Sequence, residues 1–394
     1  LDELAENLAA HGGHLYFFHG HPHEIVEQLI YSEQLSAVMI NRDYTPYSRA
    51  RDEKLQKLCE EKGVVFKAHA DVLLREPEDG ISESGKFYQI FTPFYKKNST
   101  FPVAKPHTSK LSNYATQAIA LHKKRTYIDS ILPANRIKMA HGGRYAAVRI
   151  LSSLSDFSSY GADHNDLSYS TTHLSPHNKF GTVSIREVYQ ALEKTFGPKN
   201  EISRQLYWRD FFYHVAWFNP QVFGHPFRSQ YEHISWNEKE SDFKRWCEGT
   251  TGFPVVDAGM RELNETGTMH NRARLIVGSF LVKDLHINWQ WGERYFAQQL
   301  TDYDPCVNNG NWQWVASTGC DAQPYFRIFN PWVQQKRFDP NGEYIRRWVP
   351  ELNNIDSSAL HTLYKQKSIP RGYHAPMVDH GVEVKKTKLV YGRR

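Results

Sequence analysis

Residues 301–331 read TDYDPCVNNGNWQWVASTGCDAQPYFRIFNP and combine acidic, amide and aromatic side chains at unusual density. Asp302 and Asp304 lie two residues apart, and Asn308 is followed closely by Trp312 and Trp314. The segment is too polar for a helix that only fills a core and too aromatic for a loop. Carboxylate, amide and indole groups this close together favour a pocket that binds a flat heterocycle with hydrogen-bonding edges.

Composition restricts the class of protein to which the chain belongs. Its 394 residues are 40% hydrophobic and 23% charged, as expected for a folded protein with one large or two smaller domains. Aromatic residues make up 14%, which indicates either a large aromatic core or surfaces that stack on a cofactor or on bases. The net charge of +5 is compatible with a local basic groove for a polyanion.

The cysteines and the apolar runs exclude several further classes. Cys59, Cys247, Cys306 and Cys320 are scattered with no CxxC pair, which argues against a disulfide framework and a zinc site. We therefore expect no bound metal and a reducing compartment inside the cell, either cytoplasm or nucleus, rather than secretion. No apolar run approaches ~18 residues and no signal peptide is recognisable, so we expect no membrane span.

The first 85 residues alternate between helical and extended patterns. We expect helices over 1–12, 22–33 and 50–63, and strands over 14–18, 36–41 and 64–70. This alternation predicts an α/β N-terminal domain, 1–85, built on a doubly wound parallel sheet. Such sheets begin with a strand, so we expect the first strand–helix unit to be missing, either lost or carried on a separate polypeptide.

Two further regions follow the α/β domain. Residues 86–140 contain Pro93, Pro102 and Pro106 and lack periodicity, which predicts an interdomain connector. From 141 to 394 the apolar residues recur every three to four positions, which predicts an all-α domain. Its last segment, VKKTKLVYGRR at 384–394, is basic, and we expect it to be mobile.

Three motifs outside 301–331 offer groups for a cofactor or a nucleic acid. TTHLSP (171–176) places hydroxyl groups near a helix start, as a diphosphate cradle or an ordinary N-cap. QLYWRDFFYHVAWF (205–218) is an aromatic helix, and most such helices fill a core. MHNRARLIVGSFLVKDL (269–285) offers Arg274, which we expect to pair with Asp302 across the pocket, the simpler alternative being a surface ion pair.

Together with 301–331, these motifs resemble those of the DNA photolyase and cryptochrome family, in the same order, from about Thr171 to Leu352. The resemblance is greatest to class I enzymes that repair cyclobutane pyrimidine dimers. It implies an antenna-type α/β domain followed by a helical domain that binds FAD and the DNA lesion. The residues for which it implies FAD contacts are Tyr160, Thr171, Thr172, Leu174, Ser175, Arg274, Asp302, Tyr303, Asp304 and Asn308.

The same resemblance implies a DNA-binding surface around the pocket. Trp208 and Trp314 match two indoles that clamp a damaged base pair flipped out of the duplex. UV-damaged DNA is therefore the expected partner, bound by a monomer that a separate N-terminal segment would complete. The residues implied on the DNA side are Gln205, Trp208, Arg209, Asn271, Arg272, Trp314, Arg327 and Gln334.

Electron transfer in this family implies a further group of residues. Trp312, Trp289 and Trp236 match tryptophans that relay an electron from the surface to photo-excited, oxidised flavin, although three core indoles would be the more common arrangement. The resemblance places Asn308 beside flavin N5, where its amide tunes the protonation of the reduced flavin. With Gln205, these residues form the expected catalytic group.

Gln205 and His270 leave the lesion class open. Gln205 stands where dimer-repairing relatives usually carry Glu, and an amide cannot gain a proton as a carboxylate can. Relatives that repair the (6-4) photoproduct have Gln at this place, but they also have paired histidines in the segment where this chain has His270 alone. Because the second difference changes the chemistry, dimer repair is the preferred prediction and (6-4) repair the alternative.

The resemblance thus implies a light-driven carbon–carbon lyase in which reduced FAD passes an electron to the dimer and the two bonds between the bases split. A cryptochrome-like photoreceptor without repair activity is a second alternative, opposed by Asn308 and the two indoles. A truncated, inactive remnant is a third. The antenna pigment stays open, because Tyr47 and Ser48 precede Arg49 where folate-binding relatives have Asn-Glu.

Overall fold

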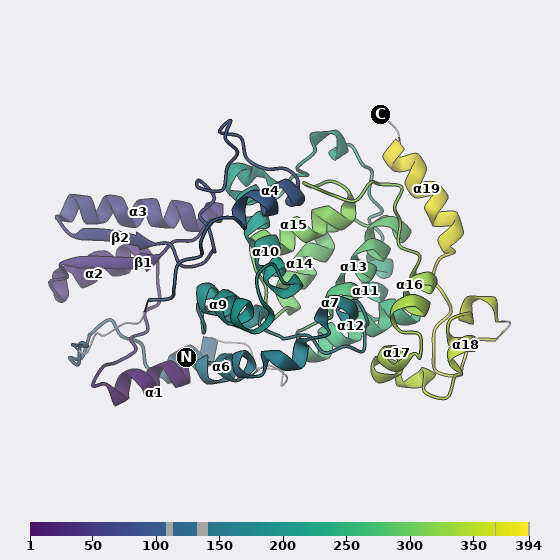
Figure 1. Cartoon of the computed structure of the whole chain (residues 1–394), viewed down its shortest axis with the longest axis horizontal. Coiled ribbons are helices and arrows are strands. Elements are labelled where there is room, and N and C mark those ends of the chain that lie inside the picture. Colours follow the sequence, from purple (N-terminus) through teal and green to yellow (C-terminus); the bar gives the residue numbers. More distant parts are fainter. Residues whose placement is uncertain (108–112, 132–140, 367, 393–394) are drawn as a thin grey trace.

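The structure, a computed structural model, describes residues 1–107, 113–131, 141–366 and 368–392. A two-stranded parallel sheet with its helices lies at one end, and a large helical region makes up the rest (Figure 1). The sheet end consists of α1 (Asp2–Ala10), α2 (Pro22–Ser32), β1 (Ala37–Asn41), α3 (Pro46–Lys62) and β2 (Val65–His69). None of the described helices has the length and apolar character that a bilayer span requires.

The unit β1–α3–β2 confirms part of the expected α/β domain. The two strands are parallel, and their register pairs Ala37 with Val65. Between them, α3 begins after the N-cap Thr45, whose side chain accepts a backbone N–H, and ends at Gly63 in the left-handed conformation. The sequence pattern placed both strands and the helix end at Gly63 correctly, but it began the helix at 50, four residues after the observed start at Pro46.

The strand expected at 14–18 was wrong, and the sheet is narrower than a doubly wound sheet. The backbone of this segment is satisfied elsewhere, since Phe17 donates its N–H to His122 Nδ1 at 2.9 Å. Lys123 in turn donates its N–H to the carbonyl of Phe17 at 2.7 Å. Within β2 every residue except Phe66 is exposed. The backbone of residues 14–18 therefore hydrogen-bonds to the connector and does not join the sheet.

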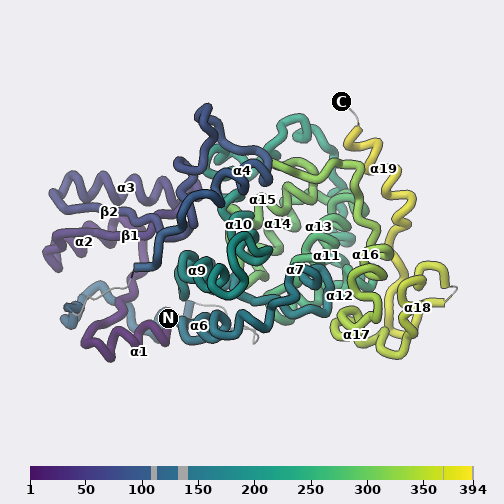
Figure 2. The backbone as a smooth tube through the Cα atoms, viewed as in Figure 1, coloured from purple at the N-terminus to yellow at the C-terminus, as the bar shows by residue number. Residues whose placement is uncertain are grey.

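The connector contains two helices that its sequence pattern did not indicate, α4 (Phe91–Asn98) and α5 (Arg125–Ile131). Pro93 lies in the first turn of α4, where a missing N–H removes no helical hydrogen bond. Phe91 and Phe94 are buried and carry α4 onto the helical region. Figure 2 shows the chain running from β2 toward α4 and the helical region. Residues 108–112 and 132–140, also predicted as connector, lie outside the described residues.

The expected all-α region forms. Its α-helices are α6 (Arg144–Ser152), α7 (Tyr160–Asp163), α8 (Ser175–Phe180), α9 (Ile185–Phe196), α10 (Glu201–Phe218), α11 (Glu240–Glu248), α12 (Pro254–Thr266), α13 (Asn271–Ser279), α14 (Trp289–Gln299), α15 (Pro305–Ala316), α16 (Pro331–Phe338), α17 (Glu343–Trp348), α18 (Ser357–Leu360) and α19 (His380–Gly392). A π-helical turn, η4 (Phe280–Asp284), continues α13. Short 3-10 turns are η1 (Leu154–Phe157), η2 (Pro220–Val222), η3 (Ser229–Tyr231), η5 (Pro350–Leu352) and η6 (Leu363–Lys365).

Helix α15 packs against both α10 and α14, and two glycines make this close approach possible. A Cβ atom on Gly310 of α15 would lie 2.1 Å from the ring of Phe212 in α10. A Cβ atom on Gly292 of α14 would lie 2.1 Å from the indole of Trp312. The absence of side chains at these two crossings therefore brings the polar, aromatic helix α15 into the middle of the helical region.

The C-terminal segment forms helix α19, so the expectation of a mobile tail was wrong. Helix α19 packs on η4. The imidazole of His380 hydrogen-bonds to the carboxylate of Asp284, and His286 Nε2 lies 2.9 Å from Glu383. Within the basic segment, the hydroxyl of Thr387 donates to the carbonyl of Lys283, so contacts with η4 hold this part of α19 as well. Residues 393–394 lie outside the described residues.

Candidate functional site

A cavity of about 1840 Å³ lies where the segment 167–182 meets α10, α13 and α15. It is larger than the ~300–1,000 Å³ typical of a small-ligand site, so it suits a dinucleotide together with further bases. Its walls come from all four motifs singled out in the sequence. The predicted site residues that line it are Thr171, Thr172, Leu174, Ser175, Gln205, Trp208, Arg209, Asn271, Arg274, Asp302, Tyr303, Asp304, Asn308, Trp312 and Trp314.

A second group of predicted residues lies away from the cavity. Tyr160 stacks on His164 with ring centroids 5.1 Å apart. The guanidinium of Arg272 hydrogen-bonds to Asn165 and lies 4.4 Å from the ring centroid of Phe338. Neither Tyr160 nor Arg272 lines the cavity. The predicted residues of this group are Tyr160, Trp236, Arg272, Trp289, Arg327 and Gln334.

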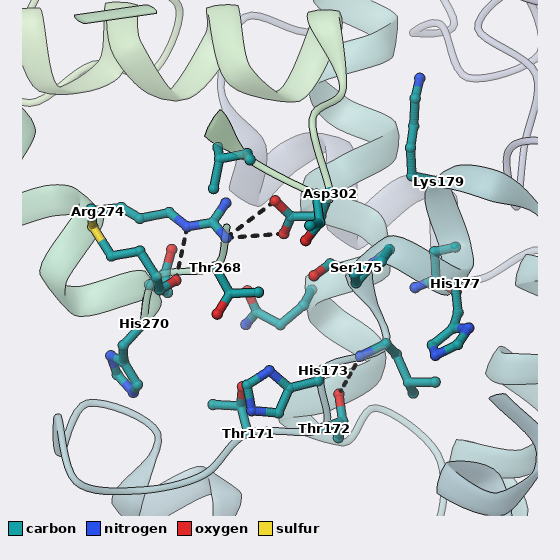
Figure 3. Close-up of a pocket in the computed structure, with 18 of the residues that line it drawn as sticks. Thr171, Thr172, His173, Ser175, His177, Lys179, Thr268, His270, Arg274 and Asp302 are labelled. Carbon is teal, nitrogen blue, oxygen red and sulfur yellow. Dashed lines mark hydrogen bonds and ion pairs between the residues drawn. The ribbon is translucent and has the colours of Figure 1, made fainter. Parts of the chain in front are cut away.

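Arg274 and Asp302 form the ion pair that the sequence predicted. Arg274 Nη2 lies 3.0 Å and 3.2 Å from the two carboxylate oxygens, and Arg274 Nε donates to the carbonyl of Met269 at 2.9 Å. Figure 3 shows the two side chains facing one another, with Thr268 and Ser175 beside them. Burial is the largest effect and acts to raise the pKa of Asp302, but the Arg274 charge and the hydrogen bonds from Arg274 and Ser175 together outweigh it and leave the pKa below its ordinary value. The cavity thus holds a fixed carboxylate that accepts hydrogen bonds.

Asp304 starts helix α15. Its Oδ1 accepts the backbone N–H groups of Cys306 at 3.0 Å and Val307 at 3.1 Å, as an N-cap does. Its other oxygen lies 3.3 Å from Lys179 Nζ and accepts the hydroxyl of Tyr213. Asp304 therefore fixes the position of the helix that carries Asn308, Trp312 and Trp314, a role that its sequence spacing from Asp302 did not reveal.

Sequence reasoning missed Glu293, which holds the amides of α15 in place. Asn308 donates from Nδ2 to the backbone carbonyl of Glu293 at 3.0 Å, and Asn309 donates to the Glu293 carboxylate at 2.8 Å. Burial raises the pKa of Glu293 to about 7, a shift that the bond from Asn309 only partly offsets. The available signal was an acidic residue inside the apolar pattern of 291–300. One N–H of the Asn308 amide is thereby engaged, which orients its oxygen.

The segment 171–175 wraps the cavity through its backbone as well as its hydroxyls (Figure 3). His173 has a left-handed φ of 51°, which is uncommon for a residue with a Cβ. The hydroxyl of Thr172 accepts the N–H of Leu174 at 3.4 Å, and Leu174 is buried beneath the segment. A left-handed residue directly after two threonines turns the chain sharply, which suits a cradle for a charged group.

Two DNA-side predictions differ in their surroundings. Gln205 is exposed, and among the described residues its side chain makes only a long bond of 3.4 Å from Nε2 to the carbonyl of Glu201. Arg209 lines the cavity, but its guanidinium donates to the carbonyl of Val72 at 2.6 Å and its side chain is only 12% exposed. The Arg209 cation is thus already bound to the segment after β2, which limits what it offers to DNA.

The three predicted relay tryptophans differ in exposure, and Trp236 is the most exposed of them. Trp312 and Trp289 are buried, whereas Trp236 is half-buried. Trp312 packs edge-on against Phe296 at 5.0 Å and against Trp246 at 6.2 Å between ring centroids. Among the described ring pairs, none joins two of the three predicted indoles. Trp246, fully buried, is an aromatic neighbour that sequence reasoning missed.

Several buried polar atoms on the cavity wall indicate a polar ligand. Within the described residues, four lining side chains carry a buried nitrogen or oxygen that no protein group satisfies: Tyr169 Oη, Asn178 Oδ1, Arg209 Nη2 and His270 Nε2. Burial, followed by the charges of Arg272 and Arg274, lowers the pKa of His270 to about 4, so its ring is neutral at physiological pH. Buried polar atoms are ordinarily hydrogen-bonded, and a dinucleotide offers the missing donors and acceptors. The residues present therefore fit FAD.

Comparison with known families agrees with this site. Residues 202–393 match the model described as the FAD binding domain of DNA photolyase, and residues 1–110 match the model described as DNA photolyase. The chain belongs to the DNA photolyase family. A deoxyribodipyrimidine photo-lyase of Vibrio cholerae is 37% identical over 384 residues, which cover 93% of this chain and 81% of that protein.

Solved structures show the same fold. A crystal structure of an archaeal photolyase from Sulfolobus tokodaii, described with two FAD molecules and a novel light-harvesting cofactor, is 40% identical. The match covers 100% of the present chain and 87% of the archaeal chain, with a TM-score of 0.90. A bacterial class III photolyase from Agrobacterium tumefaciens is 32% identical, covers 100% of this chain and 86% of its own, and has a TM-score of 0.94. The photolyase-like fold and the FAD-binding domain expected from the sequence are thus confirmed.

Proposed function

We propose that this protein is a light-driven DNA repair lyase that splits cyclobutane pyrimidine dimers. The single observation that carries the proposal is the cavity itself. Four segments far apart in the chain line it, and its wall includes the Arg274–Asp302 ion pair, the Asn308 amide, and the indoles of Trp208 and Trp314. Relatives that are named deoxyribodipyrimidine photo-lyase support the same reaction.

The proposal assigns FAD to the inner part of the cavity. Hydroxyl groups of Thr171, Thr172 and Ser175 suit its phosphates, the Arg274–Asp302 pair suits its polar edges, and the Asn308 amide suits the flavin ring. Tyr160, which lies outside the cavity wall, is the weakest of the proposed FAD contacts. When bound, reduced FAD supplies the light-driven electron that splits the dimer.

The protein's own side chains bind and orient the lesion. Trp208 of α10 and Trp314 of α15 both line the cavity and are half-buried, so each offers an aromatic face to a base flipped from the duplex. Gln205 is exposed at the same wall and offers hydrogen bonds to the bases. Outside the cavity, we propose that Arg272, Arg327 and Gln334 contact the DNA, with Asn271 at the rim.

We propose that Trp236, Trp289 and Trp312 form the route by which an electron reaches oxidised flavin. Trp236 is half-buried, Trp289 is buried, and Trp312 is buried and lines the cavity, which supports a path that begins at Trp236 and ends at Trp312. The proposal also keeps the division of the chain into 1–85, 86–140 and 141–394, with the antenna pigment unassigned. We also propose that the protein acts as a monomer and is located where the cell keeps its DNA.

The test is a repair assay with two substrates. The protein, loaded with reduced FAD, is mixed with duplexes that carry either one cyclobutane dimer or one (6-4) photoproduct and exposed to blue light. We expect loss of the dimer alone. Loss of the (6-4) lesion alone would support the alternative that Gln205 favours, and repair of neither by flavin-loaded protein would overturn the proposal.

A further inference from the structure

The indole of Trp208 is stacked on a phenyl ring from a different part of the chain. Phe91, the first residue of α4, lies parallel to it with 3.7 Å between ring centroids and 8° between ring planes. Phe91 is 1% exposed and does not line the cavity, whereas Trp208 does. The phenyl ring therefore backs the indole on the side away from the cavity.

Phe91 is itself held on several sides. Its backbone N–H donates to the carboxylate of Asp321 at 3.1 Å, which ties α4 to the chain that leaves α15. Its ring lies edge-on to Phe211 at 5.9 Å, and the guanidinium of Arg204 lies 5.5 Å from the ring centroid. A ring this constrained is a rigid surface for the indole stacked on it.

We propose that Phe91 is a positioning residue for lesion binding. By stacking on one face of Trp208, it holds the indole plane in a single orientation at the cavity wall. A flipped base then finds a preorganised aromatic surface, so less side-chain entropy is lost on binding. This inference rests on the proposed function, because it needs Trp208 to contact the lesion.

The chain offers a matched control for this position. Phe94 lies in the same helix, is 3% exposed, and packs on Phe211 and His214 at 5.4 Å and 5.1 Å. Among the described ring pairs, it has none with Trp208. Phe91→Leu and Phe94→Leu thus make the same change at equal depth, and only the first removes a ring stacked directly on the indole; Phe94 reaches Trp208 through Phe211.

The experiment measures the dissociation constants for a duplex with one dimer and for the undamaged duplex, in the FAD-loaded protein. We expect Phe91→Leu to weaken binding of the damaged duplex about 3- to 10-fold, the range of one lost aromatic pair. Binding of the undamaged duplex, the flavin absorbance and the melting temperature should match those of Phe94→Leu. Phe91→Met, which fills the space without a planar ring, repeats the test should the leucine variant fold poorly.

A double-mutant cycle separates positioning from general packing. In a Trp208→Ala background, Phe91→Leu should cause no further loss of affinity for the damaged duplex. An additive loss there, or equal effects of Phe91→Leu and Phe94→Leu, would overturn the inference and leave the proposed function intact. If Trp208→Ala alone binds the damaged duplex normally, the proposed lesion wall fails, and this inference fails with it.

Discussion

Arg274 and Asp302 meet across the cavity, with 3.0 Å between a guanidinium nitrogen and a carboxylate oxygen. The Asp302 side chain is 8% exposed and the Arg274 side chain 27%, so loss of the carboxylate leaves a cation that water solvates only in part. We expect Asp302→Asn to lower the free energy of unfolding by about 2 kcal/mol and to reduce FAD retention. Thermal unfolding and flavin absorbance after gel filtration measure both effects.

The control for this variant is the exposed pair Arg144–Glu187, where Glu187→Gln should cost less than about 0.5 kcal/mol. Equal effects of the two substitutions would show that the Arg274–Asp302 pair is an ordinary surface pair. The pKa of Asp302 is depressed in the folded state, so its contribution to stability is present above the unfolded pKa and is lost as the pH falls through the folded value. The cost of Asp302→Asn should therefore shrink below about pH 4.

Glu293 predicts a pH dependence of the opposite sign. Burial raises its pKa to about 7, so the folded state holds a proton that the unfolded state, with a pKa of about 4.3, releases. Stability should thus fall as the pH rises from about 4 to 7, and Glu293→Gln should remove this part of the slope. Urea unfolding at pH 5 and pH 8 measures it. An unchanged slope in the variant would show that Glu293 is not the group responsible.

Trp314 should bind the lesion by stacking. Trp314→Ala is expected to weaken binding of dimer-containing DNA by about 1–3 kcal/mol, because one base loses its aromatic partner. Trp291→Ala is the control, since this indole is also half-buried but packs on Phe243 away from the cavity. Fluorescence anisotropy with labelled duplexes provides the measurement. Equal affinities of the Trp314 variant and the parent protein would reject the stacking role.

Trp236 should serve photoreduction and not repair. Trp236→Phe is expected to block light-driven reduction of oxidised flavin, while repair stays normal when the flavin is supplied already reduced. Trp332→Phe is the control, because Trp332 is buried against Phe253 and belongs to no proposed path. Absorbance during illumination with an external reductant follows the reaction. Photoreduction at the parent rate in Trp236→Phe would mean that the electron takes another route.

A substitution at Gln205 should show which lesion the cavity is adapted to bind. Because Gln205 is exposed and weakly bonded, Gln205→Glu should leave the melting temperature unchanged. We expect it to raise the yield of dimer repair, since a carboxyl group can offer a proton that an amide cannot. The yield per absorbed photon measures this. A lower yield would show that the site is adapted to the amide.

Much of this site was predictable from sequence because its chemistry is concentrated in short motifs. The segment 301–331 contains Asp302, Asn308 and both Trp312 and Trp314, and the ion pair with Arg274 follows from opposite charges in two adjacent motifs. The helix end at Gly63 was also visible, because a left-handed C-cap glycine acts on its own backbone, whereas the helix start at Thr45 was missed.

Other features depended on partners distant in the chain. Residues 14–18 have the pattern of a strand, but their hydrogen bonds go to His122 and Lys123, so no strand forms. The basic C-terminal segment continues α19, which is held by contacts of His380 with Asp284, of Glu383 with His286 and of Thr387 with the carbonyl of Lys283.

Residue types and local backbone signals thus set the family, the helices and the chemistry of the site. Only the folded chain shows that Glu293 holds Asn308 and that Phe91 lies behind Trp208. The physical reason is that hydrogen bonds and ring stacking act over a few ångströms in space, and no local pattern encodes which distant residue comes that close.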